Sequence, residues 1–393
     1  MSDVHAPVAA TPAAPESNTP LIVAAVAGFG ALAAGIATDQ TRGLTALLAA
    51  GFLAVAAAMG PLAILALCQV ANAGFHAAFK RVLEALAATL PVGAAALLAL
   101  LPFAGSVWKW ARHGAANDKL IAAKAAYLNV PMFALRMALF LGVWMLFAFL
   151  LRRESRAQDQ DGDVAHTRKG VLYSALFILF GGYSIGLASV DWLMSTDPHW
   201  ASTIYGFYTI GVILQTGAAV TILAVASLRR AGRLPEVNEN HLHDLGKLLF
   251  GFSTLWAYLW FSQYLLIWYA NLPEETSWFL VRTSHGFAPY FYANLVINWV
   301  LPFLLLSPRP AKRNQAHLVR VAWLVMGGRM LDIWLQCGPS NLKHAPVLPW
   351  VEVGAAVGVL AVFAIVYRKM LAGAPLVARH DPYLEESLHH WQP

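Results

Sequence analysis

Acidic, histidine and aromatic side chains are concentrated in one stretch, DWLMSTDPHWASTIYGFY, which occupies residues 191–208 between two long apolar segments. Carboxylates and imidazoles near a membrane surface accept protons readily, because their pKa values can be tuned toward neutrality. We therefore predict that Asp191, Asp197 and His199 handle protons or dock a partner at the outer rim of the molecule. The Trp and Tyr residues around 192–208 favour a further interpretation, an aromatic belt at the membrane interface.

Ionisable and amide side chains also occur inside segments that are otherwise apolar. An ionisable residue within a membrane span costs about 3 kcal/mol or more, so it faces the bundle interior and suggests a function. Arg329 and Asp332 stand three residues apart on one helix face, where they form either a structural ion pair or part of a proton path. Arg136 either clamps the carbonyls of another helix or belongs to such a path. Asn294 and Asn298, four residues apart, are typical of hydrogen bonding between helices.

The candidate site residues fall into two groups. Candidates for a proton path are Arg136, Asp191, His199, Tyr264, Glu274, Arg329, Asp332, His76 and Glu84. Candidates for a partner interface or a position close to quinol are Trp192, Asp197, Trp200, Gln263, Glu275, Arg282 and His285. His76, Lys80 and Glu84 follow one another at i, i+4 and i+8, which indicates either the opposite mouth of the path or a solvated helix end with i,i+4 pairing.

The elements that must position these side chains are membrane-spanning helices. Of the 393 residues, 59% are hydrophobic and 12% are charged, whereas soluble domains carry about 25% charged residues. A transmembrane helix needs about 20 mostly apolar residues. Runs of this kind predict about ten spans, at 21–38, 44–74, 82–104, 129–151, 171–190, 203–228, 246–270, 287–307, 317–337 and 349–371. The fold class is therefore an all-α, polytopic membrane protein.

The charges in the loops predict how the chain is oriented. With ten spans both termini share one side, and the loops on that side carry eighteen Lys and Arg residues against seven on the other side. Cytoplasmic loops are enriched in Lys and Arg, so we expect both termini to be cytoplasmic. We expect a disordered tail at 1–20, a membrane domain at 21–371 with bundles near 44–190 and 203–337, and a C-terminal tail at 372–393. The net charge of +6 reflects this topology and does not indicate nucleic-acid binding.

Ligand counting argues against most cofactors in this chain. Cys68 and Cys337 are the only cysteines, fewer than the four thiolates of an iron–sulfur cluster. The thirteen histidines fall in predicted loops, tails or span ends, where they cannot ligate a haem inside the membrane. No nucleotide-binding loop or hydrolase motif is present. We therefore predict no metal site in this chain and expect any redox centres to belong to its partners.

The stretch 191–208 and a second stretch, FSQYLLIWYANLPEETSWF at 261–279, carry a family resemblance. Together they resemble the signature of the ActF subunits of bacterial alternative complex III, a quinol:electron-acceptor oxidoreductase. These subunits are similar to the NrfD or polysulfide-reductase membrane anchors. The resemblance extends from about the second span to the tenth, and excludes the N-terminal tail and the residues after about 372.

The resemblance implies ten helices with two four-helix bundles, located in the bacterial inner membrane. It implies that this chain holds no metal cofactor, whereas haem c, iron–sulfur clusters and quinol reside in partner subunits. The implied partners are an ActC-like quinone-binding subunit, haem c subunits, an iron–sulfur subunit, a terminal oxidase and lipid. Proton translocation is the implied role, and the motif members that carry over without assigned roles are Asp191, Asp197, His199, Gln263, Tyr264, Glu274 and Glu275.

Two other functions remain open from the sequence. A stand-alone, proton-coupled secondary transporter would place its substrate at broken helices near the membrane midplane. Proline occurs within or near several spans, at Pro61, Pro91, Pro131 and Pro302, but no corresponding pair of interrupted helices is evident. A purely structural anchor is the third interpretation, which neutral effects of replacing Asp191, Asp332 or Glu274 would favour.

Overall fold

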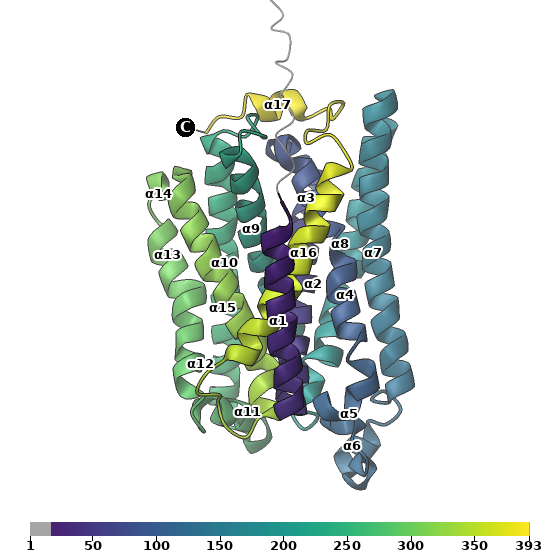
Figure 1. Cartoon of the computed structure of the whole chain (residues 1–393), viewed down its shortest axis with the longest axis vertical. Helices are drawn as coiled ribbons and strands as arrows, with labels where there is room; N and C mark the ends of the chain where they lie inside the picture. Colours follow the sequence, from purple (N-terminus) through teal and green to yellow (C-terminus); the bar gives the residue numbers. More distant parts are fainter. Residues whose placement is uncertain (1–16, 393) are drawn as a thin grey trace, which may run out of the picture.

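The computed structural model describes residues 17–392, and all regular structure in this range is helical. The long helices run side by side along the long axis of the molecule (Figure 1). They are α1 (Thr19–Thr38), α2 (Gln40–Val70), α7 (Val130–Asp161), α8 (Ala165–Trp192), α9 (Tyr205–Arg230), α10 (Glu239–Ala270), α15 (Gln315–Asn341) and α16 (Trp350–Ala372). Shorter helices complete the chain: α3 (Lys80–Ala87), α4 (Leu90–Leu98), α5 (Ala104–Val107), α6 (Lys119–Ala123), α11 (Pro273–Thr283), α12 (Ala288–Leu295), α13 (Leu301–Leu306), α14 (Arg309–Arg313) and α17 (Leu384–Leu388).

Eight helical segments of the described chain are long and apolar enough to cross a membrane. They are Thr19–Thr38, Gln40–Val70, Gly74–Val107, Val130–Asp161, Ala165–Thr196, Tyr205–Arg230, Ala288–Leu306 and Trp350–Ala372. Each of the eight contains most of one predicted span. The remaining predicted spans, 246–270 and 317–337, lie within α10 and α15, which are not among the eight. Both of these helices carry polar side chains along their length.

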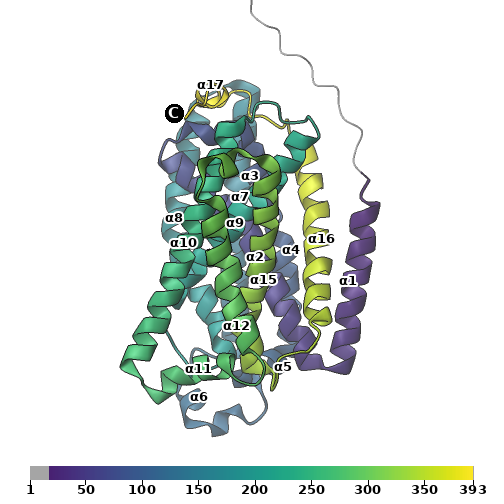
Figure 2. The same ribbon diagram turned by 90° about the vertical axis from the view of Figure 1, so that its left-hand side faces the viewer.

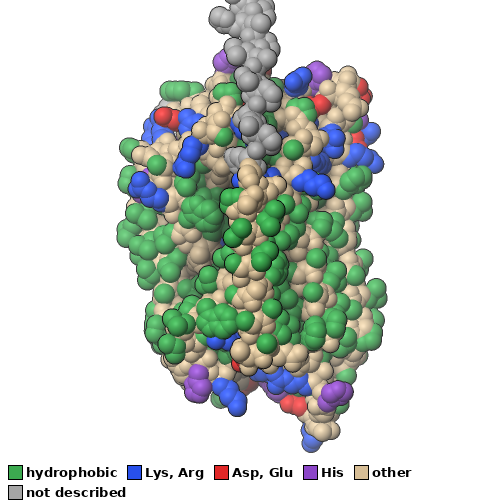
Figure 3. Space-filling view, viewed as in Figure 1, with side chains coloured by type: hydrophobic (Ala, Val, Ile, Leu, Met, Phe, Trp, Pro, Cys, Tyr) green, Lys and Arg blue, Asp and Glu red, His purple; other side chains and the backbone are tan. Residues whose placement is uncertain are grey.

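The surface agrees with a membrane environment. On the face shown in Figure 3, hydrophobic side chains cover the middle of the molecule, whereas Lys and Arg side chains lie near its two ends. Many large apolar side chains point outward, among them Leu135, Leu139 and Phe149 on α7. Such a surface is unfavourable in water and favourable in lipid. The chain is a helical membrane protein.

Helix α2 lies at the centre of the molecule and contacts α4, α8, α9, α15 and α16. Its sequence AAGFLAVAAAMG presents small side chains, which let neighbouring helices approach closely. The closest approach is to α9, because a Cβ atom added at Gly60 would lie 2.3 Å from the Cα atom of Gly217. Since α2 contacts helices from both predicted bundles, it joins the two halves of the chain.

Helices α1 and α16 form a pair at one side of the molecule (Figure 2). Gly28 packs on Gly358, and Gly35 packs on Val351, at distances that leave no room for a Cβ atom. The glycine-rich segment GFGALAAG of α1 therefore serves close helix packing, as expected for small residues within an apolar run.

Both ends of the described chain lie at the same end of the bundle, where α17 covers the helix ends (Figures 1 and 2). The opposite end carries α5, α6 and α11. The predicted N-terminal tail falls mostly outside the described residues, and α1 already includes residues 19 and 20. The predicted C-terminal tail is folded against the bundle, since Asp381 and Ser387 are buried in contacts with residues 75–80.

Candidate functional site

A buried ion pair lies at the centre of the polar residues within the bundle. Arg329 and Asp332, one turn apart on α15, are both fully buried, and Arg329 Nη1 lies 3.4 Å from Asp332 Oδ2. The hydroxyl of Tyr208 on α9 donates to Asp332 Oδ1 at 2.5 Å, and Asn294 Nδ2 on α12 donates to the same oxygen at 2.7 Å. Gln336 Nε2 in turn donates to the Tyr208 hydroxyl at 3.0 Å. Side chains from three helices thus converge on one carboxylate.

A break in helical geometry between α12 and α13 extends the polar contacts around Asp332 toward α10. Residues Val296–Val300 form a π-helical turn between α12 and α13, and turns of this kind are frequent at functional sites. Asn298 lies in this turn, where its Oδ1 accepts from Arg329 Nε at 2.8 Å. Pro302 has no N–H to donate to the carbonyl four residues before it. Gln215 Nε2 donates to that carbonyl, Asn298 O, and also to Ser253 Oγ on α10, both at 2.8 Å.

We call this arrangement the central polar cluster, and its members are Tyr208, Gln215, Ser253, Asn294, Asn298, Arg329, Asp332 and Gln336. Within residues 17–392, three of its charged atoms have no hydrogen-bond partner: Arg329 Nη1, Arg329 Nη2 and Asp332 Oδ2. The guanidinium also lies over the Trp256 ring, 4.4 Å from its centroid. A carboxylate and a phenol linked by a hydrogen bond can pass a proton between them, and the neighbouring amides can orient water at the open positions.

The sequence pointed to part of this cluster and missed the rest. The i,i+3 spacing correctly placed Arg329 opposite Asp332, and the i,i+4 spacing correctly brought Asn294 to Asn298, whose Nδ2 donates to Asn294 Oδ1 at 2.6 Å. Gln215 and Ser253 were not among the candidates. Pro302 was a signal that the carbonyl of Asn298 needs another donor, because a proline inside a helix cannot pair with the carbonyl four residues before it. Gln215 supplies that donor.

A second ion pair links α7 to the end of α8. Arg136 contacts Asp191 through both oxygens, with Nε–Oδ2 at 2.7 Å and Nη2–Oδ1 at 3.1 Å. Its Nη1 donates to Tyr127 O at 3.0 Å, and its guanidinium lies 3.8 Å from the centroid of the Tyr127 ring. Asp191 is fully buried, so this bidentate pair fixes one end of the 191–208 stretch. The two residues were separate candidates in the sequence and are partners in the structure.

The Trp and Tyr side chains of this stretch are buried inside the protein, whereas Phe207 is exposed. Trp192, Trp200, Tyr205 and Tyr208 are each at most 3% exposed, which contradicts the interpretation of these rings as a lipid-facing belt. Trp192 is held through its carbonyl, which accepts from the indole of Trp108 at 3.1 Å. Trp192 ends α8, Trp200 lies in the connection, and Tyr205 and Tyr208 begin α9, so these four rings fill the core where the two helices meet their neighbours.

Arg282 on α11 stabilises the end of α15. Its Nε donates to Leu335 O and its Nη2 donates to Gln336 O, both at 2.8 Å. Leu335 O is the carbonyl that Pro339, which lies inside α15, cannot pair with. The guanidinium also stacks 3.4 Å from the centroid of the Trp278 ring. Arg282 is only 1% exposed and is therefore part of the helix framework beside the central polar cluster.

The other candidates at this end of the molecule do not join the cluster. His199 Nε2 lies 2.7 Å from Asp118 Oδ2 on the surface, and this hydrogen bond lowers the pKa of Asp118. His285 has a left-handed φ of 50° and contacts the Ser284 hydroxyl at 2.7 Å. Tyr264 stacks on the Trp260 ring. Asp197 and Glu275 are half-buried, and Glu274 is exposed.

Gln263 lies in an apolar groove between α8, α9 and α10, with a volume of about 1070 Å³. The side chain is 5% exposed, and its Oε1 has no hydrogen-bond partner within the described chain. Gly186 and Gly206 allow α8 and α9 to approach at the floor of the groove. Glu275 lines the same groove, so the structure brings these two interface candidates together.

The residues at the opposite end form contacts that the sequence did not predict. His76 lies in a 3₁₀ segment, Gly74–Phe79, whereas Lys80 and Glu84 belong to α3, so the three do not share one continuous helix face. All are at most 4% exposed, which contradicts a solvated helix end. Lys80 Nζ pairs with Asp381 Oδ2 at 2.6 Å, because the C-terminal segment folds over this surface.

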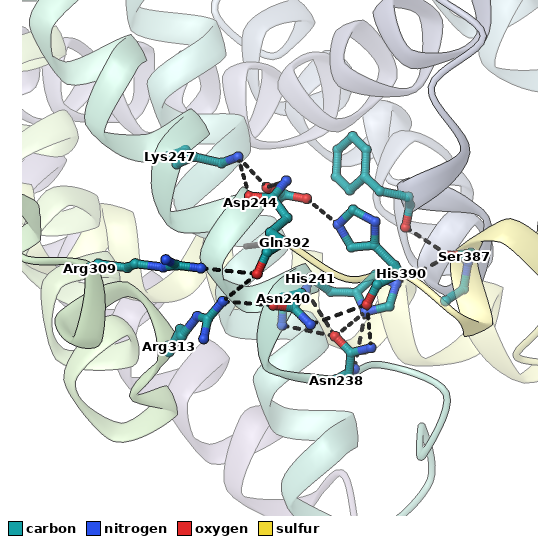
Figure 4. A network of polar contacts seen from close by, with 12 residues as sticks. Asn238, Asn240, His241, Asp244, Lys247, Arg309, Arg313, Ser387, His390 and Gln392 are labelled. Atoms are coloured by element: carbon teal, nitrogen blue, oxygen red, sulfur yellow. Dashed lines mark hydrogen bonds and ion pairs between the residues drawn. The ribbon is translucent and has the colours of Figure 1, made fainter.

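A further network joins the C-terminal segment to the start of α10 (Figure 4). His390 Nε2 lies 2.6 Å from Asp244 Oδ2, and Lys247 Nζ lies 2.6 Å from Asp244 Oδ1. The backbone carbonyl of Gln392 accepts from Arg309 at 3.0 Å and from Arg313 at 3.2 Å. Residues more than 140 positions apart are joined here, and no local pattern in the sequence indicates such a pairing.

No family model matches the chain, and a comparison with curated proteins finds no significant match. Within residues 17–392, no three or more His, Cys, Asp or Glu side chains gather where they could hold a metal ion. The resemblance to ActF subunits therefore depends on the two quoted stretches of sequence.

Proposed function

We propose that the chain is an integral subunit of a quinol:electron-acceptor oxidoreductase of the alternative complex III type, where it conducts protons and anchors its neighbours in the bacterial inner membrane. The observation that carries this proposal is the central polar cluster. A buried ion pair and a buried tyrosine are costly inside a membrane domain, so their presence favours a function. The two family-like stretches supply the assignment to a quinol-oxidising complex.

In this proposal protons move along the hydrogen bonds of the central polar cluster. Tyr208 and Asp332 exchange protons, because a phenol and a carboxylate share the hydrogen bond of 2.5 Å. Arg329 places its positive charge beside this pair, with Nη1 3.4 Å from Asp332 Oδ2. Asn298 and Gln215 orient the adjoining groups, and water must carry protons past these amides to Ser253 on α10.

The second half of the path leads toward the end that carries α17, which is the cytoplasmic end in this proposal. Ser253 and Asp244 are separated by nine residues of α10, or about 13 Å along the helix axis. The proposal requires water to bridge this interval, with protons entering through the network of Asp244 and His390. Electron transfer in the partner subunits drives transport by favouring one protonation state of the cluster over the other.

The chain holds no redox centre in this proposal, so the electron-transfer chemistry belongs to its partners. An ActC-like subunit binds quinol, and haem c and iron–sulfur subunits carry the electrons onward to an acceptor such as a terminal oxidase. The rim formed by Asp197, His199, Glu274 and Glu275 is the proposed docking surface for the outer subunits, because these acidic and histidine side chains are at least partly accessible. The remaining apolar surface contacts lipid and the neighbouring membrane subunit.

One observation favours the alternative, a proton-coupled secondary transporter. The segment from α12 to α13 is interrupted by the π-helical turn Val296–Val300, and transporters place substrates at interrupted helices. A transporter would move protons when the isolated chain is supplied with its substrate, without any haem or iron–sulfur subunit.

Proton release by the intact complex in proteoliposomes tests the proposal. We expect Asp332→Asn to retain quinol oxidation when an uncoupler is present but to lose the protons released per electron. Arg230→Gln is the control, because this exposed side chain lies outside the cluster. An Asp332→Asn complex with the wild-type ratio of protons to electrons would refute a path through this carboxylate.

A further inference from the structure

We propose that a cavity between α4, α7 and α16 binds an anionic phospholipid, with its phosphate held by Arg152, Arg156 and Lys369. The cavity has a volume of about 700 Å³ and is lined by residues from the start of α4, from α7 and from the end of α16. It lies outside the central polar cluster, and the proposal is independent of proton conduction.

One face of α7 changes from apolar to cationic along the cavity. Met145, Phe149, Arg152 and Arg156 lie at i, i+4, i+7 and i+11, so they share this face. From the first to the last, the helix rises about 16 Å, which is close to half the thickness of a hydrocarbon core of about 30 Å. A phospholipid has the same order of groups, with an apolar chain followed by a charged phosphate.

The apolar part of the cavity is open to lipid. Phe149 is 60% exposed on the outer surface of α7, and the exposed Pro91 of α4 lines the same cavity. An acyl chain in this position would cover apolar side chains on both helices. Lipid would therefore enter sideways from the membrane, with its headgroup at the end that carries α17.

The cationic part has donors that the protein does not use. Arg152 Nη2 donates to Met370 O at the end of α16, whereas its Nη1 is buried without a hydrogen-bond partner among the described residues. Arg156 and Lys369 are exposed and form no ion pair in the described chain. Basic pockets between transmembrane helices bind the phosphates of anionic lipids.

Arg156 and Lys369 form no ion pair with a neighbouring carboxylate in the described chain, and Glu84 attracts Arg152 without pairing with it. Glu154 pairs with Arg153 at 2.7 Å and with His166 at 2.7 Å, on the side of α7 that faces α8. Glu84 pairs with Arg81 at 2.6 Å. The cavity therefore keeps a positive charge that a phosphodiester would complement.

Lipid retention by the full chain, purified with its partners in mild detergent and analysed by native mass spectrometry, tests the inference. After delipidation, phosphatidylglycerol should bind in preference to phosphatidylcholine. The double variant Arg156→Gln/Lys369→Gln should weaken phosphatidylglycerol binding about 30-fold, since each surface cation contributes about fivefold to the affinity. The matched control is Arg230→Gln/Arg320→Gln, which removes two exposed cations elsewhere and should bind as the wild type does.

Three results would overturn the inference. Equal binding of phosphatidylcholine would show a site for apolar chains alone. Unchanged phosphatidylglycerol binding by the double variant would show that these cations do not hold the phosphate. Displacement of the lipid by excess inorganic phosphate would show a site for the free anion. Both substituted side chains are exposed, so the variants should fold, and an unchanged melting temperature without added lipid checks this.

Discussion

Replacing Asp332 with asparagine tests whether the buried pair is ionised. The change keeps an oxygen that can accept from Tyr208 and Asn294, at the position of Oδ1. It replaces the oxygen that lies 3.4 Å from Arg329 with an amide that carries no negative charge. Because Arg329 is fully buried, its charge then lacks a counter-ion.

We expect Asp332→Asn to lower the free energy of unfolding by about 3–5 kcal/mol, the usual cost of leaving one charge of a buried pair uncompensated. The double variant Arg329→Met/Asp332→Asn removes both charges and should recover about 1–3 kcal/mol of that loss. The assay is equilibrium unfolding in mixed micelles, followed by tryptophan fluorescence.

Glu274→Gln is the matched control, since this carboxylate is exposed and should change the free energy of unfolding by no more than about 0.5 kcal/mol. The reasoning is refuted if Asp332→Asn is as stable as the control. The single variant Arg329→Met completes the comparison. The coupling is also refuted if the losses of stability in Asp332→Asn and Arg329→Met add up to the loss in the double variant, because a coupled pair must deviate from additivity.

Three further predictions follow from the packing and the polar contacts. Arg282→Gln should lower stability by about 3 kcal/mol through the loss of charged hydrogen bonds. The loss should be smaller in a Pro339→Ala background, where the freed carbonyl regains a backbone donor, and unfolding of the wild type, the two single variants and the double variant measures this. Gly217→Ala should lower the free energy of unfolding by about 1–3 kcal/mol, because a Cβ atom there would lie 2.4 Å from the backbone of α2. Gly142 has open space around it, so Gly142→Ala should change the free energy of unfolding little in the same assay. Burial opposes ionisation of Asp381, but the adjacent Lys80 outweighs this effect and lowers the pKa of the carboxyl. The contribution of this ion pair to stability is therefore complete above pH about 4 and is lost as the pH falls through the lowered pKa. Hydrogen exchange of residues 374–392 should rise in that acidic range and, in Asp381→Asn, already at neutral pH.

Local patterns in the sequence predicted the helices and the contacts made within one helix. Apolar runs indicated the membrane helices because the required length is set by the bilayer. The pairing of Arg329 with Asp332 followed from the geometry of one turn. These features depend only on residues that are close in the chain.

Contacts between distant segments could not be predicted in the same way. Asp191 lies 55 residues from Arg136, and Asp381 lies 301 residues from Lys80, so no periodicity relates them. The Trp and Tyr rings after Asp191 satisfy the composition of an interfacial belt, yet they are buried because they lie on the faces of α8, α9 and their connection that pack against other helices. The amphipathic character of Trp and Tyr is compatible both with the membrane surface and with contacts between helices, and only the fold decides between the two positions.

The central claim is that this chain works within a quinol-oxidising complex, and affinity purification from native membranes tests it most directly. The tagged chain is extracted in mild detergent, and the co-purifying material is analysed by optical spectroscopy and assayed for quinol oxidation. We predict haem c and iron–sulfur signals together with quinol oxidation in the same fraction. A colourless chain that purifies alone, stable and without quinol oxidation, would contradict the claim.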